Sequence, residues 1–184
     1  MNRMTKRALV GLALTASILL FVAPSAQSAS TATAVMHDAS GERAGVVVLR
    51  AKGQRLTVTA RMALPTGAAG FHGFHIHTVG VCDPATGFAS AGGHLGSVEG
   101  HVHDDHAGDM PSLLVQEDGR ATLAFETDRA MLDQIFDGDG AAVIVHQGAD
   151  NFANIPERYA PNGPDATTLN TGDAGARLLC GELR

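Results

Sequence analysis

The strongest constraint on the fold is a period-two alternation of apolar and polar residues. Between positions 56 and 62 every second residue is apolar, and the residues between them are Thr or Arg. This alternation is typical of a strand with one buried face. Further short β-favouring runs are bounded by Gly, Pro or Asp: 31–36, 45–50, 73–77, 112–116, 121–125, 141–146 and 177–181. Many short strands separated by turns predict an antiparallel sandwich or barrel.

Three stretches of the chain depart from this pattern. Residues 128–136 favour a short helix or turn, whereas 78–109 and 151–176 show no strand pattern. Loops of that length in a compact domain are usually functional or disordered. We therefore expect an all-β domain that carries two long functional loops.

The first 28 residues read as a secretory signal peptide, which leaves 29–184 as one domain. Three positive charges precede an uncharged apolar run that ends at Ala23, and cleavage is expected after Ser28 or Ala29. The run is short and Ala-rich for a membrane span, so we expect no stable membrane partner. A retained N-terminal anchor is the alternative. The predicted destination is outside the cytoplasm: secreted, periplasmic or associated with the cell wall.

The net charge limits the classes of partner that the protein can bind, and the cysteine content indicates its redox environment. The chain has a net charge of −6, and loss of the signal peptide would remove three further positive charges. This acidity argues against nucleic acid as a partner. Cys82 and Cys180 are the two cysteines, and an even count in an exported chain predicts a disulfide over two free thiols. The pattern leaves the oligomeric state open, with a homodimer among the alternatives.

Histidines cluster in one part of the sequence. Seven of the nine lie between His72 and His106. His75 and His77 are two residues apart on a predicted strand, so both side chains should leave one face while Phe74 and Ile76 enter the core. His146 ends another predicted strand and could approach the same ion. An all-imidazole site suits copper or zinc, although any one of these histidines alone is more often a surface or core residue.

Five ordered blocks resemble the copper/zinc superoxide dismutases: Gly70-Phe-His-Gly-Phe-His-Ile-His77, Ser90-Ala-Gly-Gly-His94, His106-Ala-Gly-Asp109, Val145-His146 and Gly172-Asp-Ala-Gly-Ala-Arg-Leu-Leu-Cys-Gly181. The resemblance covers essentially all of residues 29–184. It implies a Greek-key β-sandwich, for which the family is an example, and an enzyme that converts superoxide to dioxygen and hydrogen peroxide at a redox-cycling copper.

The resemblance also implies roles for individual residues. Copper would be held by four histidines: His75, His77, His94 and His146. Zinc would share His94 and add three further ligands: His103, His106 and Asp109. His101 is the alternative to His103, and a copper-only protein is the alternative to a zinc-containing one.

Three further assignments follow from the same resemblance. Arg177 would attract and orient superoxide, because its fixed guanidinium suits an anion. Asp150 would accept hydrogen bonds from a copper histidine and a zinc histidine, which sets ring orientation. Cys82 and Cys180 match the family disulfide. Two rival hypotheses are a copper-buffering protein without turnover and a non-enzymatic extracellular sandwich.

Overall fold

The computed structural model describes residues 30–65, 67–98 and 102–184. The predicted signal peptide and His101 lie outside these described residues. No helix among the described residues has the length and apolar character needed to cross a membrane.

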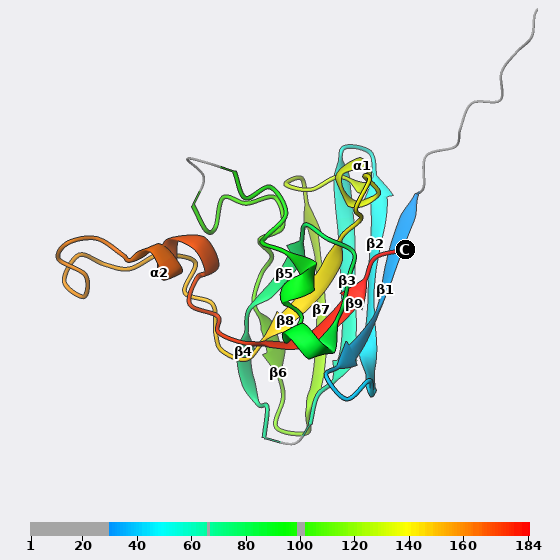
Figure 1. The fold of residues 1–184 in the computed structure, drawn as a ribbon, viewed down its shortest axis with the longest axis horizontal. Coiled ribbons are helices and arrows are strands. Elements are labelled where there is room, and N and C mark those ends of the chain that lie inside the picture. Colours follow the sequence, from blue (N-terminus) through cyan, green and yellow to red (C-terminus); the bar gives the residue numbers. More distant parts are fainter. Residues whose placement is uncertain (1–29, 66, 99–101) are drawn as a thin grey trace, which may run out of the picture.

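The described strands form one antiparallel sheet that curls into a barrel (Figure 1). In chain order they are β1 Thr31–Asp38, β2 Arg43–Lys52, β3 Arg55–Ala63, β4 Gly70–His72, β5 Phe74–His77, β6 Leu113–Val115, β7 Arg120–Thr127, β8 Ala142–His146 and β9 Arg177–Glu182. Their spatial order is β4-β6-β7-β3-β2-β1-β9-β8-β5. Because β4 and β5 are consecutive along the chain, the two edges of the sheet meet. The predicted all-β class is confirmed.

The apolar residues of the alternating segments fill the interior of the barrel. Leu56, Val58 and Ala60 on β3 are fully buried, and Met62 is nearly so. On β5, Phe74 and Ile76 enter the same core, with exposed fractions of 0% and 1%. The two histidines of β5 therefore point out of the barrel wall, as the period of two requires.

The strand predicted at 73–77 begins earlier in the structure, at Gly70, and is divided into β4 and β5. Gly73 separates β4 from β5, and its amide donates to the Gly148 carbonyl at 2.8 Å. A Cβ at this position would lie 2.5 Å from the Ala174 Cβ. The break thus lets the segments that flank β8 and β9 approach the strand closely.

The helices are short. The segment predicted as a helix or turn contains α1, Leu132–Ile135. The 3-10 turns η1, Pro84–Thr86, and η2, Ala89–Ala91, lie in the first long loop. The second long loop contains α2, Ala166–Thr171, which the sequence pattern did not predict. Asp165 caps α2 by accepting from the Thr168 amide at 2.9 Å.

Candidate metal centre

The outward face of β5 is covered by both long loops, which buries its histidines. His75 and His77 have exposed fractions of 0% and 1%. Pairing of β5 with β8 brings His146 to the same face, and a backbone bridge between His77 and His94 adds a fourth imidazole from the first long loop. One nitrogen from each of these four rings lies within 4.8 Å of the others. The structure therefore brings together all four predicted copper ligands.

Three nitrogens in this group are buried and have no hydrogen-bond partner among the described residues: His75 Nδ1, His77 Nε2 and His146 Nε2. The other nitrogen of each ring has a fixed partner, at 2.7 Å, 2.9 Å and 2.9 Å: Asp150 Oδ2 for His75, the Gly92 carbonyl for His77 and the Gly175 carbonyl for His146. Each ring donates its proton to that partner, so its lone pair is on the unpartnered nitrogen. Buried polar atoms without partners are costly, and a metal ion would satisfy all three.

Burial keeps these rings neutral. It lowers the pKa of His75 to about 4 and that of His146 to about 3, with neighbouring histidines adding to the effect. The pKa of His77 is also well below its ordinary value, again chiefly because of burial. A neutral imidazole is the form that binds a metal.

A second group lies on the other side of His94. His94 Nδ1 is 2.8 Å from Asp109 Oδ1, and His103 Nδ1 is 3.2 Å from the same oxygen. His106 Nδ1 lies 3.3 Å from Asp109 Oδ2. Within the described residues, neither His106 nitrogen has a hydrogen-bond partner, and His103 Nδ1 also lacks one. Ligand atoms of His75, His94, His103 and Asp109 lie within 4.8 Å of one another, a set that does not include His106.

The second group contains one ring, His103, that favours its charged form, whereas burial keeps three rings of the first group neutral. Burial disfavours a charged ring, but the nearby carboxylates of Asp109 and Asp150 outweigh it and raise the pKa of His103 to about 9. Burial likewise opposes ionisation of Asp109, yet His103 and His94 hold the pKa of this carboxyl well below its usual range.

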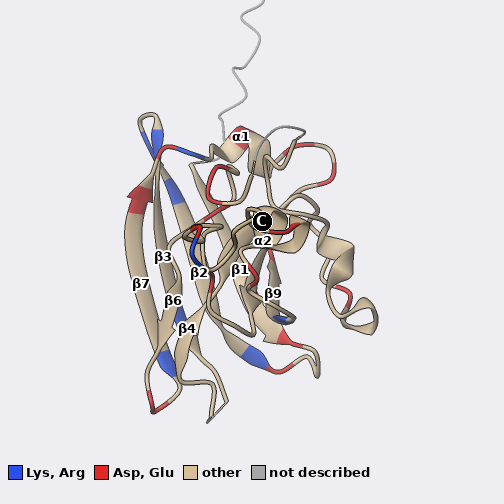
Figure 2. Cartoon of the chain, turned by 90° about the vertical axis from the view of Figure 1, so that its left-hand side faces the viewer, with Lys and Arg blue, Asp and Glu red and all other residues tan. Residues whose placement is uncertain are grey.

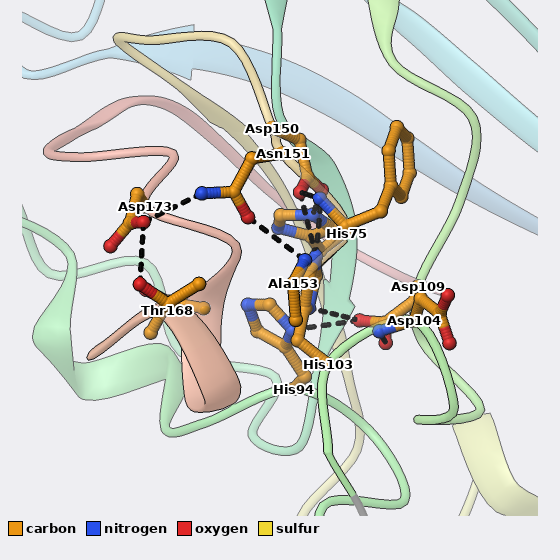
Figure 3. A network of polar contacts seen from close by, with 12 residues as sticks. His75, His94, His103, Asp104, Asp109, Asp150, Asn151, Ala153, Thr168 and Asp173 are labelled. Atoms are coloured by element: carbon orange, nitrogen blue, oxygen red, sulfur yellow. Dashed lines mark hydrogen bonds and ion pairs between the residues drawn. The ribbon is translucent and has the colours of Figure 1, made fainter. Parts of the chain in front are cut away.

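Asp150 joins the two groups (Figure 3). One carboxylate oxygen is 2.7 Å from His75 Nε2, and the other is 2.8 Å from His103 Nε2. The Phe152 amide also donates to Asp150 at 2.7 Å. A single buried carboxylate therefore fixes one ring from each group.

The two long loops meet at this carboxylate. The His103 amide donates to the Leu169 carbonyl of α2 at 2.6 Å. Gly172 ends α2 at a φ of +59°, and a Cβ there would overlap the Asp150 carboxylate and lie 2.5 Å from His103 Nε2. Only a residue without a side chain leaves room for this contact.

Arg177, the first residue of β9, is held beside the first group. Its guanidinium donates to the Phe88 and Gly92 carbonyls, each at 2.6 Å. The Gly92 carbonyl also accepts from His77, so one oxygen orients both side chains. Arg177, His77, His94 and His146 line a cavity of about 440 Å³ that α2 borders from the other side.

The predicted disulfide is confirmed. Cys82 and Cys180 are bonded, which ties the first long loop to β9. Cys180 packs in a small buried cluster with Phe88 and Ile144. Phe88 has a left-handed backbone, with a φ of 63°, which is uncommon for a bulky residue. The disulfide and this cluster hold the loop that carries the acceptors for Arg177.

Sequence reasoning missed three residues that shape the centre: Phe88, Gly172 and His72. His72 is buried, and its ring nitrogens contact the His146 and Ala68 carbonyls at 2.8 and 2.7 Å. In the sequence His72 is one of the clustered histidines. The structure shows that it is not in either metal-facing group, because both of its ring nitrogens contact backbone carbonyls. Phe88 and Gly172 act through their backbones, and side-chain patterning does not report on such contacts.

A β-barrel with a buried histidine cluster, two ionised carboxylates and unpartnered imidazole nitrogens defines a metalloprotein. Comparison with known proteins identifies the family. Residues 43–183 match the family model for copper/zinc superoxide dismutase (SODC). The chain therefore belongs to the copper/zinc superoxide dismutase family, whose name carries the two metals that were predicted.

Three relatives illustrate the match. The chain is 50% identical to "Superoxide dismutase [Cu-Zn]" of Mycobacterium tuberculosis over 128 residues, which is 62% of this chain and 53% of that protein. It thus spans about half the length of this mycobacterial relative. It is 35% identical to the Escherichia coli K12 protein of the same name over 185 residues, covering 92% of this chain and 96% of that one. The structure of "Cu/Zn superoxide dismutase from Brucella abortus" aligns with a TM-score of 0.63 at 26% identity, over 84% and 99% of the two chains.

Proposed function

We propose that this protein is an exported superoxide dismutase that converts superoxide to dioxygen and hydrogen peroxide. The observation that carries the proposal is the convergence of three unpartnered, buried imidazole nitrogens beside the guanidinium of Arg177. Family membership supports the same chemistry. The disulfide supports export, because disulfides persist in oxidising compartments.

We propose that copper binds His75, His77, His94 and His146. The donor set fits, because burial keeps His75, His77 and His146 neutral and one nitrogen of each of the four rings lies within 4.8 Å of the others. Imidazole is a suitable ligand for copper in proteins. Bound copper would supply the redox chemistry, taking an electron from one superoxide and giving it to the next.

We propose that zinc binds His94, His103, His106 and Asp109. Three imidazoles and a carboxylate suit a closed tetrahedral zinc site. The unpartnered nitrogens of His103 and His106 favour this set. The contact between His103 and Asp150 supports His103 as the third imidazole in preference to His101.

Arg177 would attract and orient the substrate. Its two carbonyl partners fix the guanidinium at the wall of the cavity, so its remaining N–H groups can meet an anion that enters. The chain's net charge of −6 would repel superoxide at long range. Attraction must therefore be local to Arg177 and the metal centre.

His94 is suited to handle a proton. Asp109 fixes one of its nitrogens at 2.8 Å, while the other belongs to the four-histidine group at the cavity. This nitrogen can bind either copper or a proton but not both at once, so a proton that it carried while free of copper could be delivered to peroxide. Asp150 would keep His75 oriented through the cycle, because its carboxylate fixes the other nitrogen of that ring.

Metal analysis of the purified protein, alongside a superoxide-consumption assay, tests the proposal. We expect bound copper and zinc together with turnover. Copper without turnover would instead indicate a copper-buffering protein, and a metal-free, inactive protein would indicate a structural module.

A variant then isolates Arg177. We expect Arg177→Glu to lower kcat/KM by about 100-fold or more while copper stays bound, because the charge that meets the substrate is reversed. Arg158→Glu is the matched control, since Arg158 lies over the Tyr159 ring and does not line the cavity. Unchanged activity in Arg177→Glu would remove Arg177 from the mechanism.

A further inference from the structure

Positive charge is concentrated on one face of the barrel. Ten Lys and Arg residues lie between positions 29 and 184. Six of them are on three neighbouring strands, β2, β3 and β7: Arg43, Arg50, Lys52, Arg55, Arg61 and Arg120. These strands show basic residues along their length in Figure 2, while most acidic residues lie on loops. Glu126 is the single acidic residue within the three strands.

All six basic side chains are exposed, and at least two of them are close neighbours. Arg61 pairs with Thr122 across β3 and β7, and Arg120 is two residues from Thr122 on the same face. Diagonal neighbours of this kind are within reach of each other's long side chains. Arg43, Arg61 and Arg120 line one shallow depression whose other lining residues are neutral. Arg120 also has an ion-pair contact with Asp118, at 3.8 Å, but its side chain is 81% exposed.

The second basic group is at the other end of the same strands. Lys52 pairs with Arg55 across the β2–β3 turn, and Arg50 precedes them. Lys52 contacts Glu126 at 2.5 Å, but its side chain is 68% exposed. Arg55 and Arg61 are six residues apart on β3, which places the two groups about 20 Å from each other.

The surface between the two groups is made of small side chains. Thr57 and Thr59 face outward from β3, and Thr122 and Ala124 face outward from β7. The aromatic residue of β7, Phe125, packs against the core. The face thus offers charge without aromatic rings for stacking on nucleic-acid bases or for insertion into a membrane.

The basic face is also remote from the metal centre. β3 and β2 are in the middle of the sheet order, whereas β8 and β5, which carry the metal-facing histidines, are at one end. In the closed barrel these pairs lie on opposite sides (Figure 1). A molecule bound to the basic face would leave the cavity at Arg177 open.

We propose that the face formed by β2, β3 and β7 docks a linear carbohydrate polymer that carries repeated phosphate or sulfate groups. Two arginine-rich groups spaced along the strands match an extended chain of anions. The small side chains between them allow such a chain to lie along the strands. Docking would hold the protein at an anionic matrix without blocking its chemistry.

Binding of dextran sulfate to the metal-loaded protein tests this proposal, with uncharged dextran of the same size as the negative control. The test variant is Arg61→Gln with Arg120→Gln. The matched control is Arg158→Gln with Arg184→Gln, which removes the same charge away from the face. Binding is measured over a series of salt concentrations, because polyanion binding weakens with salt in proportion to the number of contacts.

We expect the face variant to bind dextran sulfate about tenfold more weakly, with a salt slope lower by about one or two units. The control variant should bind within about twofold of the parent protein. Equal losses in both variants, or failure of the parent protein to prefer dextran sulfate over dextran, would overturn the proposal. So would tighter binding to single-stranded DNA or to phosphatidylglycerol vesicles at the same ionic strength, since these would favour a different class of partner.

Discussion

The two halves of the metal centre are built on different parts of the chain. In the proposed copper half, His75, His77 and His146 stand on paired strands, so the sheet register fixes their positions. In the proposed zinc half, His103, His106 and Asp109 all come from one loop. Their positions depend on contacts that the loop makes with Asp150 and with α2.

The halves also differ in the protonation state that their histidine rings favour. The strand-borne rings are kept neutral by burial, so they are ready to bind a cation. In the loop-borne half, His103 favours its charged form and pairs with ionised carboxylates. The difference suggests that one half is preformed by the sheet and that the other is completed by its ion.

The largest expected effect is a difference in turnover between variants of the two halves. His146→Gln should lower turnover by at least about 100-fold, because a fixed ligand to the redox metal is lost. His106→Gln should retain more activity and lose zinc. Metal content and superoxide consumption are measured for both, with His37→Gln on β1 as the matched control. Equal loss of copper in the two variants would remove the distinction.

Asp150 is the place where the two halves are coupled. Asp150→Asn should weaken the affinity for both metals by about 10- to 100-fold, because an amide cannot accept from both His75 and His103 as a carboxylate does. Competition with chelators measures each affinity, and Asp133→Asn on the exposed side of α1 is the control. If only zinc affinity changed, the strand-borne half would be independent of this link.

The backbone of Arg177 belongs to strand β9, but its guanidinium is held by carbonyl groups of the first long loop. Phe88→Ala should lower kcat/KM by about tenfold with copper retained, since loss of the buried ring loosens the carbonyl that accepts from Arg177. Phe88→Leu should restore most of the activity. The exposed Phe71→Ala serves as the control. A purely structural role would lower the free energy of unfolding and leave kcat/KM unchanged.

The smallest expected effect is a pH dependence of the metal-free protein. The pKa values of His75, His77 and His146 are below the ordinary 6.5, so the free energy of unfolding should rise with pH up to about 6.5. His103 has the opposite sign. Its pKa of about 9 gives a contribution that is full below pH 6.5 and is lost as the pH rises through 9.

Denaturant unfolding at several pH values checks this prediction. Stability should be greatest near pH 6.5, and His103→Gln should remove a decline of about 1–3 kcal/mol on the alkaline side. The rise on the acidic side should persist in that variant. A decline that persisted in His103→Gln would show that another group causes it.

The sequence predicted the strand-borne half better than the loop-borne half, for a physical reason. Alternation on β5 assigns Phe74 and Ile76 to one face and His75 and His77 to the other, because a strand has a fixed period of two. No such period applies between His94 and Asp109, where spacing alone left His101 and His103 as alternatives. Helix α2 was missed because its Thr-rich sequence lacks apolar periodicity and is stabilised locally by Asp165.

Contacts made by backbone atoms were likewise invisible in the sequence. The Gly92 carbonyl orients both His77 and Arg177, yet any residue type has a carbonyl. The family resemblance supplied Arg177, which lies in its last block, and Asp150, which follows His146 by four residues. Their side chains act directly. They did not supply Phe88, whose contribution depends on its left-handed backbone.

The close approach of Gly172 to His103 and Asp150 has a consequence for protein engineering. Positions 103, 150 and 172 belong to different segments but must be compatible in one small volume. A loop transplanted from a relative would fit only if its counterpart to position 172 also lacked a side chain. The two long loops should therefore be exchanged as a pair, and libraries that vary one of them should keep this glycine fixed.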